Sequence, residues 1–531
     1  MEFLKENHVD NAIIMAAGLS SRFLPLSLEK PKGLLEVKGE ILIERQIRQL
    51  LEAGINDITI VVGYKKEMFY YLKDKFNVDI VVNNEYNIRN NNSTLYAVKE
   101  RLKNTYICSS DNYFTKNVFE SYVPHSYYSA VYEEGFTDEY CITTDDNDII
   151  TNVSIGGNNS WVMLGHVYFS RDFSNKFVEI LEKVYNDPDV DKMLWEDIYI
   201  KHLNELPMKL KKYNKDEVLE FDSLEDLRKF DKSYLKDSRS QIIKNICSIL
   251  KCKENDPCNF TQLKQGLTNI SLLFEVNKNK YIYRHPGDGT KEIINRESEC
   301  FSQNIARELD LDNTFIYMNS NDGWKISKFI ENCVNFDYKN PIHVKKAISL
   351  VKKLHDSNIK SKWEVNLFKE SDRLLNLVLN NYKISSYKID VVREKINKLY
   401  EFTECDEIEK RLCHVDCYAP NFLTDENSMY LIDWEYSGNS DPASDIGTFI
   451  CCSEYTVDEA IEILKIYFGR DLTPIEERHY IAYIAICSYY WFVWALYKES
   501  LGDNLEYYIK LWYKYSNIYS DISLDLYTKS K

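Results

Sequence analysis

The chain has 531 residues, which is too long for a single hydrophobic core and fits two domains joined by a connector. Its 83 acidic residues outnumber its 66 basic residues, so the formal net charge is −17. Because phosphate backbones and anionic lipids attract basic faces, this balance argues against a general nucleic-acid-binding or membrane-surface protein.

The thirteen cysteines contain no C-x-x-C pair, and residues 1–10 lack the regions of a signal peptide. We therefore expect reduced thiols and a cytoplasmic location. The most apolar run, residues 480–497, is rich in tyrosine and closely flanked by charge. We interpret it as a core helix of the second domain, with no stable insertion into a membrane.

The first predicted strand, residues 11–17, runs into the turn Gly-Leu-Ser-Ser-Arg, and Lys32 follows after a loop with two prolines. Free backbone N–H groups at such a turn suit a triphosphate, and Lys32 would add a mobile positive charge. An ordinary strand-to-helix turn is the alternative. The turn has neither the G-K-[ST] of a Walker motif nor the G-x-G-x-x-G of a dinucleotide site.

Further buried strands are predicted at residues 57–62, 78–82 and 106–108, alternating with helices. This pattern predicts a doubly wound, mainly parallel α/β sheet with ligands beyond the carboxyl ends of its strands. Asn91 follows one of these strands and Asp111 follows another. Asp111 could hold Mg²⁺ there, and a turn-forming aspartate is an equal alternative.

The string AAGLSSRFLPLSLEKPKGL, residues 16–34, resembles nucleotidyltransferases that couple a nucleoside triphosphate to a phosphate monoester and release pyrophosphate. Over residues 11–231, the segments WED and EFDSLEDLRK are similar to bacterial CTP:phosphocholine cytidylyltransferases. This resemblance implies that Asp222 joins Asp111 at the metal, although a helix cap at Asp222 or Ser223 is the competing interpretation. The predicted nucleotide contacts are Ala17, Gly18, Ser20, Arg22, Lys32 and Asn91, with Lys32 also catalytic.

A quaternary ammonium cannot donate a hydrogen bond, so its site needs aromatic faces and nearby carboxylates. The candidates for phosphocholine binding in this half are Trp161, Trp195, Glu196 and Asp197. Trp161 lies on an apolar strand, where a tryptophan is usually part of the core.

We place the first domain at residues 1–232, a polar connector at 233–258 and the second domain at 259–531. The second domain opens with a loop that contains Gly266 and Asn269, followed by a predicted hairpin. In kinase-like folds, such a loop covers the nucleotide phosphates. Gly266 and Asn269 are therefore candidate nucleotide contacts.

Four polar residues at close spacing stand out in the second domain: His414, Asp416, Asn421 and Asp433. Transfer of a γ-phosphoryl group needs an acceptor hydroxyl in line and a cation over the phosphate oxygens. Asp416 can take the hydroxyl proton, and Asn421 and Asp433 offer the hard oxygen ligands that Mg²⁺ prefers. Each residue alone often caps a turn, but the four together favour phosphoryl transfer.

The pattern H-x-D-x4-N followed by I-D-W-E-Y resembles the choline/ethanolamine kinase branch of the aminoglycoside-phosphotransferase-like kinases, which share the protein-kinase fold. This resemblance implies that Asp416 is the catalytic base and that Asn421 and Asp433 are metal ligands. It also implies that Arg284 contacts the ATP phosphates, with Glu299 as its partner and Glu297 as the alternative. Residues 325–330 resemble the hinge strand that takes the adenine.

Trp491 and Trp494 are three residues apart and share one helical face. Such a stripe is more often core, but choline kinases carry a similar W-x-x-W. The candidates for choline binding in this half are Trp434, Glu435, Tyr436, Trp491 and Trp494. The tryptophan content favours choline over ethanolamine.

Together, these patterns predict an α/β nucleotidyltransferase domain followed by an α+β kinase-like domain. The expected reactions turn choline, ATP and CTP into CDP-choline through phosphocholine, with Mg²⁺ in both sites. The expected partners are these small molecules and, in a homo-oligomer, further copies of the chain, with no nucleic acid. Ethanolamine, an aminoalkyl phosphonate or a sugar phosphate remains as a substrate alternative, as does a second domain that only binds choline. The turn at Gly18 does not distinguish CTP from UTP, and the oligomeric state stays open.

Overall fold

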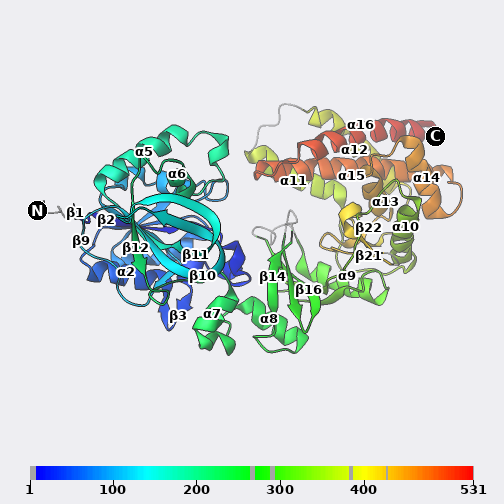
Figure 1. Ribbon diagram of the computed structural model, residues 1–531. Coiled ribbons are helices and arrows are strands. Elements are labelled where there is room, and N and C mark those ends of the chain that lie inside the picture. Colours follow the sequence, from blue (N-terminus) through cyan, green and yellow to red (C-terminus); the bar gives the residue numbers. More distant parts are fainter. Residues whose placement is uncertain (1–6, 264–268, 288–293, 382–386, 426–427, 530–531) are drawn as a thin grey trace, which may run out of the picture. The chain divides into compact units, whose positions relative to one another are not determined.

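The computed structural model describes residues 7–263, 269–287, 294–381, 387–425 and 428–529. The chain divides into two compact units, Met1–Gln262 and Leu263–Lys531 (Figure 1). The expected connector, residues 233–258, lies within the first unit. Its Tyr234 and Ile243 are buried in one apolar cluster with Phe23 and Leu35, which explains why this segment packs.

The first unit is built on a seven-stranded sheet of order β12-β10-β11-β7-β2-β5-β6. Strands β7, β2, β5 and β6 are parallel, whereas β11 runs antiparallel to both β7 and β10. The predicted parallel core is therefore present, extended into a mixed sheet by a long hairpin. The strands are β2 (Asn11–Ala16), β5 (Ile58–Val62), β6 (Asp79–Val82), β7 (Thr105–Ser109), β10 (Tyr127–Thr144), β11 (Ile150–Phe169) and β12 (Lys209–Tyr213).

Helices cover both faces of this sheet, which is why its strands are continuous apolar runs. Helix α2 lies on one side of the sheet, and α5 and α6 lie on the other (Figure 1). Ile43 and Ile47 of α2 belong to one apolar cluster, and Phe173 of α5 and Trp195 of α6 belong to another. The helices are α1 (Leu26–Glu29), α2 (Leu42–Glu52), α3 (Tyr71–Phe76), α4 (Asn92–Tyr96), α5 (Arg171–Val184), α6 (Trp195–Lys201), α7 (Leu224–Phe230) and α8 (Gln241–Leu250). The short strands are β1 (Asn7–His8), β3 (Glu36–Val37), β4 (Glu40–Ile41), β8 (Asn112–Phe114), β9 (Tyr122–Val123), β13 (Val218–Glu220) and β14 (Cys258–Gln262).

The second unit begins with an antiparallel sheet in which β15, β16, β18 and β17 are neighbours in that order. Short hairpins and a set of helices follow, which gives the predicted α+β, protein-kinase-like arrangement (Figure 1). The strands are β15 (Asn269–Val276), β16 (Asn279–Pro286), β17 (Phe315–Met318), β18 (Lys325–Lys328), β19 (Arg411–Cys413), β20 (Phe422–Thr424), β21 (Met429–Leu431) and β22 (Gly438–Ser440). The helices are α9 (Arg296–Glu308), α10 (Pro341–Asp356), α11 (Leu367–Asn381), α12 (Ile389–Glu404), α13 (Ala443–Cys451), α14 (Val457–Phe468), α15 (Pro474–Ser500) and α16 (Glu506–Lys529).

Helix α15 contains the apolar run at residues 480–497. Among the described residues, it is the one helix whose length and composition would allow it to cross a membrane. Within the unit, 94% of its most apolar window is buried against other parts of the chain. This is the environment of a core helix, as the sequence predicts.

Candidate active sites

A cavity of about 320 Å³ lies in the first unit, beside the carboxyl ends of β2 and β7. Gly33 shapes one wall, because a Cβ atom there would lie 2.7 Å from the Cβ of Ser110. A side chain at this position would therefore separate Lys32 from the end of β7. The lining includes the predicted nucleotide contacts Ala17, Gly18, Ser20, Lys32 and Asn91, and the predicted metal ligand Asp111.

Three carboxylates gather around the Lys32 ammonium group. Its Nζ lies 2.9 Å from Oδ2 of Asp111 and 3.5 Å from Oε1 of Glu220. Although burial opposes the charged form, Asp111, Glu220 and Asp222 raise the pKa of Lys32. Asp222 also pairs with Arg22, whose Nη1 lies 3.1 Å from its Oδ1. The structure thus brings together the predicted Lys32, Arg22, Asp111 and Asp222.

Glu220 is a member of this cluster that the sequence analysis did not identify. It belongs to β13, which pairs with β8 so that Glu220 lies opposite Asn112, the neighbour of Asp111. Burial, together with the charge of Asp111, raises the pKa of Glu220 to about 7. The sequence did contain one indication of this role: Glu220 lies two residues before Asp222, and residues i and i+2 of an extended segment share a face. Carboxylates of this kind fit a divalent cation such as Mg²⁺.

Asn91 connects the cavity wall to the first turn of α6. Its Oδ1 accepts a hydrogen bond from the backbone N–H of Trp195 at 2.7 Å, and its Nδ2 donates to Oε2 of Glu196 at 3.1 Å. Burial raises the pKa of Glu196 to about 7, and the Tyr128 hydroxyl donates to its other oxygen. Asn91 therefore has a positioning contact in addition to lining the cavity.

The four residues predicted to bind phosphocholine in this half do not form an open cage. Among the residues that the structure describes, none of these four lines the cavity. Trp195 is 1% exposed and stacks on Tyr128 with ring centroids 5.8 Å apart, so it is a core residue. Asp197 accepts hydrogen bonds from the Leu194 N–H at 2.8 Å and the Tyr140 hydroxyl at 2.9 Å. The segment WED forms the first turn of α6, so Trp195 packs toward the sheet and Asp197 caps the helix. Trp161 is half-buried beneath the Lys212 ammonium group, and Glu196 is engaged by Asn91 and Tyr128.

In the second unit, the loop of Asp416 is held by a buried carboxylate. The Asp445 side chain accepts hydrogen bonds from the backbone N–H groups of His414, at 3.0 Å, and Val415. Val415 has a φ of 73°, a left-handed conformation that is strained for a β-branched residue. The two hydrogen bonds from this segment to Asp445 hold that conformation in place.

The predicted base, Asp416, lies beside the predicted metal ligand Asn421, and the charge of the other predicted ligand, Asp433, acts on it. Asn421 Nδ2 donates to Oδ2 of Asp416 at 2.9 Å. Burial, with the charges of Asp433 and Glu435, raises the pKa of Asp416 well above its usual range. Although burial opposes the charged form of Asp433, Lys325 and Arg284 lower its pKa. The arrangement provides one carboxyl group that favours a proton and one that favours the ionised state.

Arg284 connects this loop to α9. Its Nη2 forms an ion pair with Glu299, and its Nη1 lies 2.9 Å from Oδ1 of Asp433. The predicted partner Glu299 is therefore in place, whereas Glu297 is exposed and pairs with Lys362 on the surface. The cluster also contains two basic residues that the sequence analysis did not assign to it, Arg296 and Lys325.

Asn269 joins the same cluster through its Nδ2, which donates to Oε2 of Glu435 at 2.8 Å. Glu435 is 5% exposed and also faces Arg284 and Arg296 at 3.8 and 3.7 Å. It therefore belongs to the basic cluster and does not join the aromatic group predicted for choline. Gly266, the other predicted contact of this loop, lies outside the described residues.

Three of the predicted choline residues do gather, and Trp491 and Trp494, at 4% and 6% exposed, also belong to the apolar core cluster of the unit. Trp494 Nε1 donates to the Tyr436 hydroxyl at 3.2 Å, and the Tyr436 and Trp491 rings form an edge-to-face pair with centroids 5.8 Å apart. The charge of Asp416 contributes to raising the pKa of Tyr436, after burial and Glu435, so this group lies near the base. Trp434, in contrast, is fully buried against the His414 ring at 4.7 Å and is a core residue.

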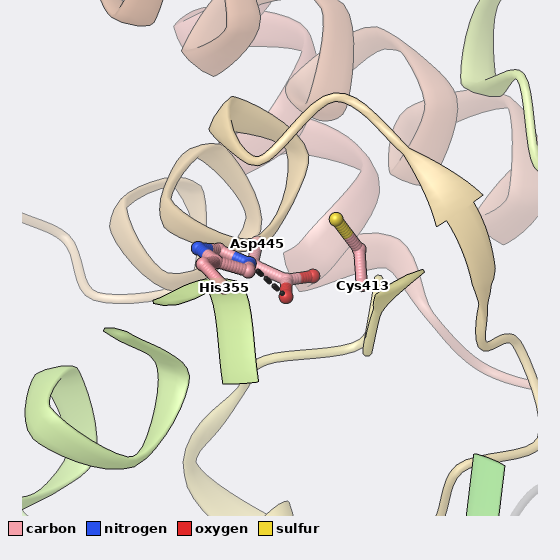
Figure 2. A group of neighbouring side chains, drawn as sticks. All are labelled: His355, Cys413 and Asp445. Atoms are coloured by element: carbon pink, nitrogen blue, oxygen red, sulfur yellow. Dashed lines mark hydrogen bonds and ion pairs between the residues drawn. The ribbon is translucent and has the colours of Figure 1, made fainter. Parts of the chain in front are cut away.

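His355, Cys413 and Asp445 form a compact buried group whose ligand atoms lie within 4.8 Å of one another (Figure 2). His355 uses both ring nitrogens, toward the Tyr467 hydroxyl at 2.8 Å and Oδ2 of Asp445 at 2.9 Å. The Cys413 thiol donates to backbone carbonyl groups, and burial raises its pKa well above the usual range. Because the group satisfies itself and anchors the Asp416 loop, we interpret it as structural.

Two protein families match this chain. The family described as MobA-like NTP transferase domain matches residues 12–131, and the family described as Choline/ethanolamine kinase matches residues 260–484. The choline-phosphate cytidylyltransferase of Streptococcus pneumoniae is 36% identical over 220 residues, which cover 41% of this chain and 96% of that protein. The 2-aminoethylphosphonate cytidylyltransferase of Lancefieldella rimae is 33% identical over 229 residues, or 42% of this chain and 93% of that protein. The crystal structure of the choline kinase LicA from Streptococcus pneumoniae matches with 24% identity and a TM-score of 0.47, covering 53% of this chain and 97% of that chain.

Proposed function

Because the N-terminal part of this chain belongs to the family of the choline-phosphate cytidylyltransferases and the C-terminal part carries a choline/ethanolamine kinase domain, we propose that the protein makes CDP-choline from choline, ATP and CTP. The chain combines a nucleotidyltransferase with a phosphotransferase. The observation that carries the proposal is their presence on one chain, since the product of the kinase reaction is the substrate of the cytidylyl transfer.

In the first proposed step, the hydroxyl oxygen of choline attacks the γ-phosphorus of ATP and ADP leaves. Asp416 in its ionised form accepts the hydroxyl proton, and the burial and neighbouring charges that raise its pKa give this carboxylate a high affinity for that proton. Arg284, already oriented by Glu299, contacts the phosphates. Asn421 and Asp433 would hold Mg²⁺, which supplies positive charge at the phosphate oxygens.

In the second proposed step, a phosphate oxygen of phosphocholine attacks the α-phosphorus of CTP and pyrophosphate leaves. This oxygen is already ionised near neutral pH, so orientation suffices and no dedicated base is needed. Lys32 and Arg22 offset the charge that grows on pyrophosphate. Asp111 and Asp222, with Glu220 beside them, would hold the divalent cation of this site.

The relative that acts on 2-aminoethylphosphonate indicates a second candidate substrate class. A kinase makes a P–O bond to an alcohol, whereas a phosphonate carries a P–C bond that no kinase forms. The kinase domain on the same chain therefore favours a phosphate ester, and Tyr436, Trp491 and Trp494 favour a quaternary ammonium over a primary amine. We also propose a cytoplasmic enzyme of small-molecule substrates, consistent with the thirteen cysteines being free thiols.

A substrate panel tests the proposal. The purified chain is incubated with Mg²⁺, ATP and each nucleoside triphosphate, together with choline, ethanolamine or 2-aminoethylphosphonate, and the nucleotide product is identified by mass spectrometry. We expect CDP-choline to form fastest. CDP-ethanolamine or a CDP-phosphonate appearing at an equal or higher rate would overturn the choice of substrate. Failure of phosphocholine to appear from choline and ATP would show that the second unit only binds its ligand.

A further inference from the structure

A buried histidine of the second unit lies between two carboxylates. His479, near the start of α15, is 0% exposed. Its Nδ1 lies 3.1 Å from Oδ2 of Asp406, and its Nε2 lies 2.9 Å from Oδ2 of Asp441. A neutral imidazole has one N–H donor and one lone pair, so it satisfies only one ionised carboxylate. Two carboxylate contacts call for the doubly protonated imidazolium.

The surroundings of His479 are balanced in charge. The Arg478 guanidinium and the Tyr527 hydroxyl, from α15 and α16, both donate to Asp406. Although burial opposes the charged form, Asp441 and Asp406 raise the pKa of His479. The two cations thus face two carboxylates inside the unit. Two further titratable groups, Tyr480 and Tyr483, have ring centroids 5.9 and 5.1 Å from that of the imidazole.

One of these carboxylates leads to the loop of the proposed catalytic base. Oδ1 of Asp441 accepts a hydrogen bond from the backbone N–H of Ala443 at 2.9 Å, which caps the first turn of α13. The same helix carries Asp445, which holds the backbone of His414 and Val415 immediately before Asp416. His479 therefore bonds to the residue that fixes the start of α13.

Helix α15 carries His479 as well as Trp491 and Trp494. The contact between His479 and Asp441 therefore connects the helix of these tryptophans to α13, which holds the loop of Asp416. We propose that His479 is a positioning residue for the kinase reaction. Its imidazolium fixes α13 against α15 and so holds Asp416 in place relative to Tyr436, Trp491 and Trp494. This inference rests on the proposed function of the second unit. It assigns His479 no contact with substrate.

Protonation of His479 is tested directly by NMR on the full-length protein with ¹⁵N-labelled histidine. The His479 signals are identified by their absence in His479→Gln. We expect both ring nitrogens to carry protons at pH 7.5, above the ordinary histidine pKa of about 6.5. A neutral tautomer at that pH would overturn the proposal, whether or not the kinase is active on choline.

The pH dependence of the two activities separates positioning from general instability. Because the folded-state pKa is raised, the contribution of His479 is complete below pH 6.5 and is lost as the pH rises through the folded-state pKa. We therefore expect kcat for phosphocholine formation to fall as the pH rises through that pKa, which gives the pH profile a descending alkaline limb. In Asp441→Asn, a neutral His479 can donate to Asp406 and accept from the amide, so the limb should move to higher pH. An unchanged limb in this variant would contradict the proposal.

His479→Gln removes the charge while it keeps one hydrogen bond. We expect kcat of the kinase reaction to fall roughly tenfold with little change in KM for ATP, as expected when positioning of the base is lost. Adding Asp441→Asn restores the charge balance and should recover most of the activity. Formation of CDP-choline from phosphocholine and CTP is the control in the same molecule. Failure of the double variant to recover, with the control reaction intact, would refute the charge argument.

Discussion

Replacing Glu299 by glutamine tests the buried ion-pair cluster around Arg284. The Glu299 side chain is 0% exposed and faces Arg284, Arg296 at 2.8 Å and Lys325 at 3.8 Å. Glutamine has nearly the same shape, so the substitution removes charge without creating a cavity. Three buried cations then share the remaining carboxylates.

The expected size of the effect follows from these contacts. Breaking a buried ion pair by removing one partner costs about 3–5 kcal/mol, because the other charge is left buried. Arg284 keeps Asp433 at 2.9 Å, and Arg296 keeps Glu435 at 3.7 Å, so we expect the lower end of that range. For a domain of this size, about 3 kcal/mol corresponds to a fall of roughly 10 °C in Tm. Arg284 should also shift toward Asp433, which raises KM for ATP.

Differential scanning calorimetry of the full chain measures the change, because the transition of the kinase unit is identified by its upward shift when ATP is added. Glu297→Gln is the matched control, since Glu297 lies on the same helix but its exposed side chain pairs 3.4 Å from Lys362. We expect Glu297→Gln to have the same Tm and the same kinase activity as the wild type. Equal melting temperatures for Glu299→Gln and the wild type, or an equal loss in the control, would refute the assignment of Glu299 as the partner of Arg284.

Three further substitutions test the two sites separately. Asp416→Asn should lower phosphocholine formation by about 10²- to 10⁴-fold, the usual contribution of a general base, and leave CDP-choline formation from phosphocholine unchanged. Lys32→Met removes the cation 2.9 Å from Asp111, so pyrophosphate release should fall while the kinase reaction continues; loss of both activities would point to misfolding. Trp491→Leu removes an aromatic face, so KM for choline should rise several-fold more than KM for ethanolamine, and equal changes would place the ammonium elsewhere.

The parallel strands of the first unit, the first hairpin of the second and the polar motifs of both could be predicted from local sequence, whereas β10, β12 and β13 were not. Continuous apolar runs marked β2, β5 and β7, because a strand covered on both faces has no polar side. The spacing from His414 to Asp433 marked the loop of the candidate base. Glu220 was missed because it reaches the Asp111 site only when β13 pairs with β8, and local patterns do not specify such a distant pairing.

The role of an aromatic residue is harder to predict from sequence than the role of a carboxylate, for a physical reason. A carboxylate at the end of a strand must find solvent, a cation or a donor, so its presence restricts what the site can be. A tryptophan is stable in the core as well as at a ligand, so position beside a motif does not decide its role. Trp434 follows Asp433 directly, yet Asp433 has a φ of 64° that turns the chain, and the indole packs on His414. Trp491 and Trp494 are also buried in the core cluster, but their partner Tyr436 comes from another segment, and the charge of Asp416 contributes to raising the pKa of Tyr436. Convergence of separate segments, which the fold provides, is what distinguishes a candidate cation site from a core stripe.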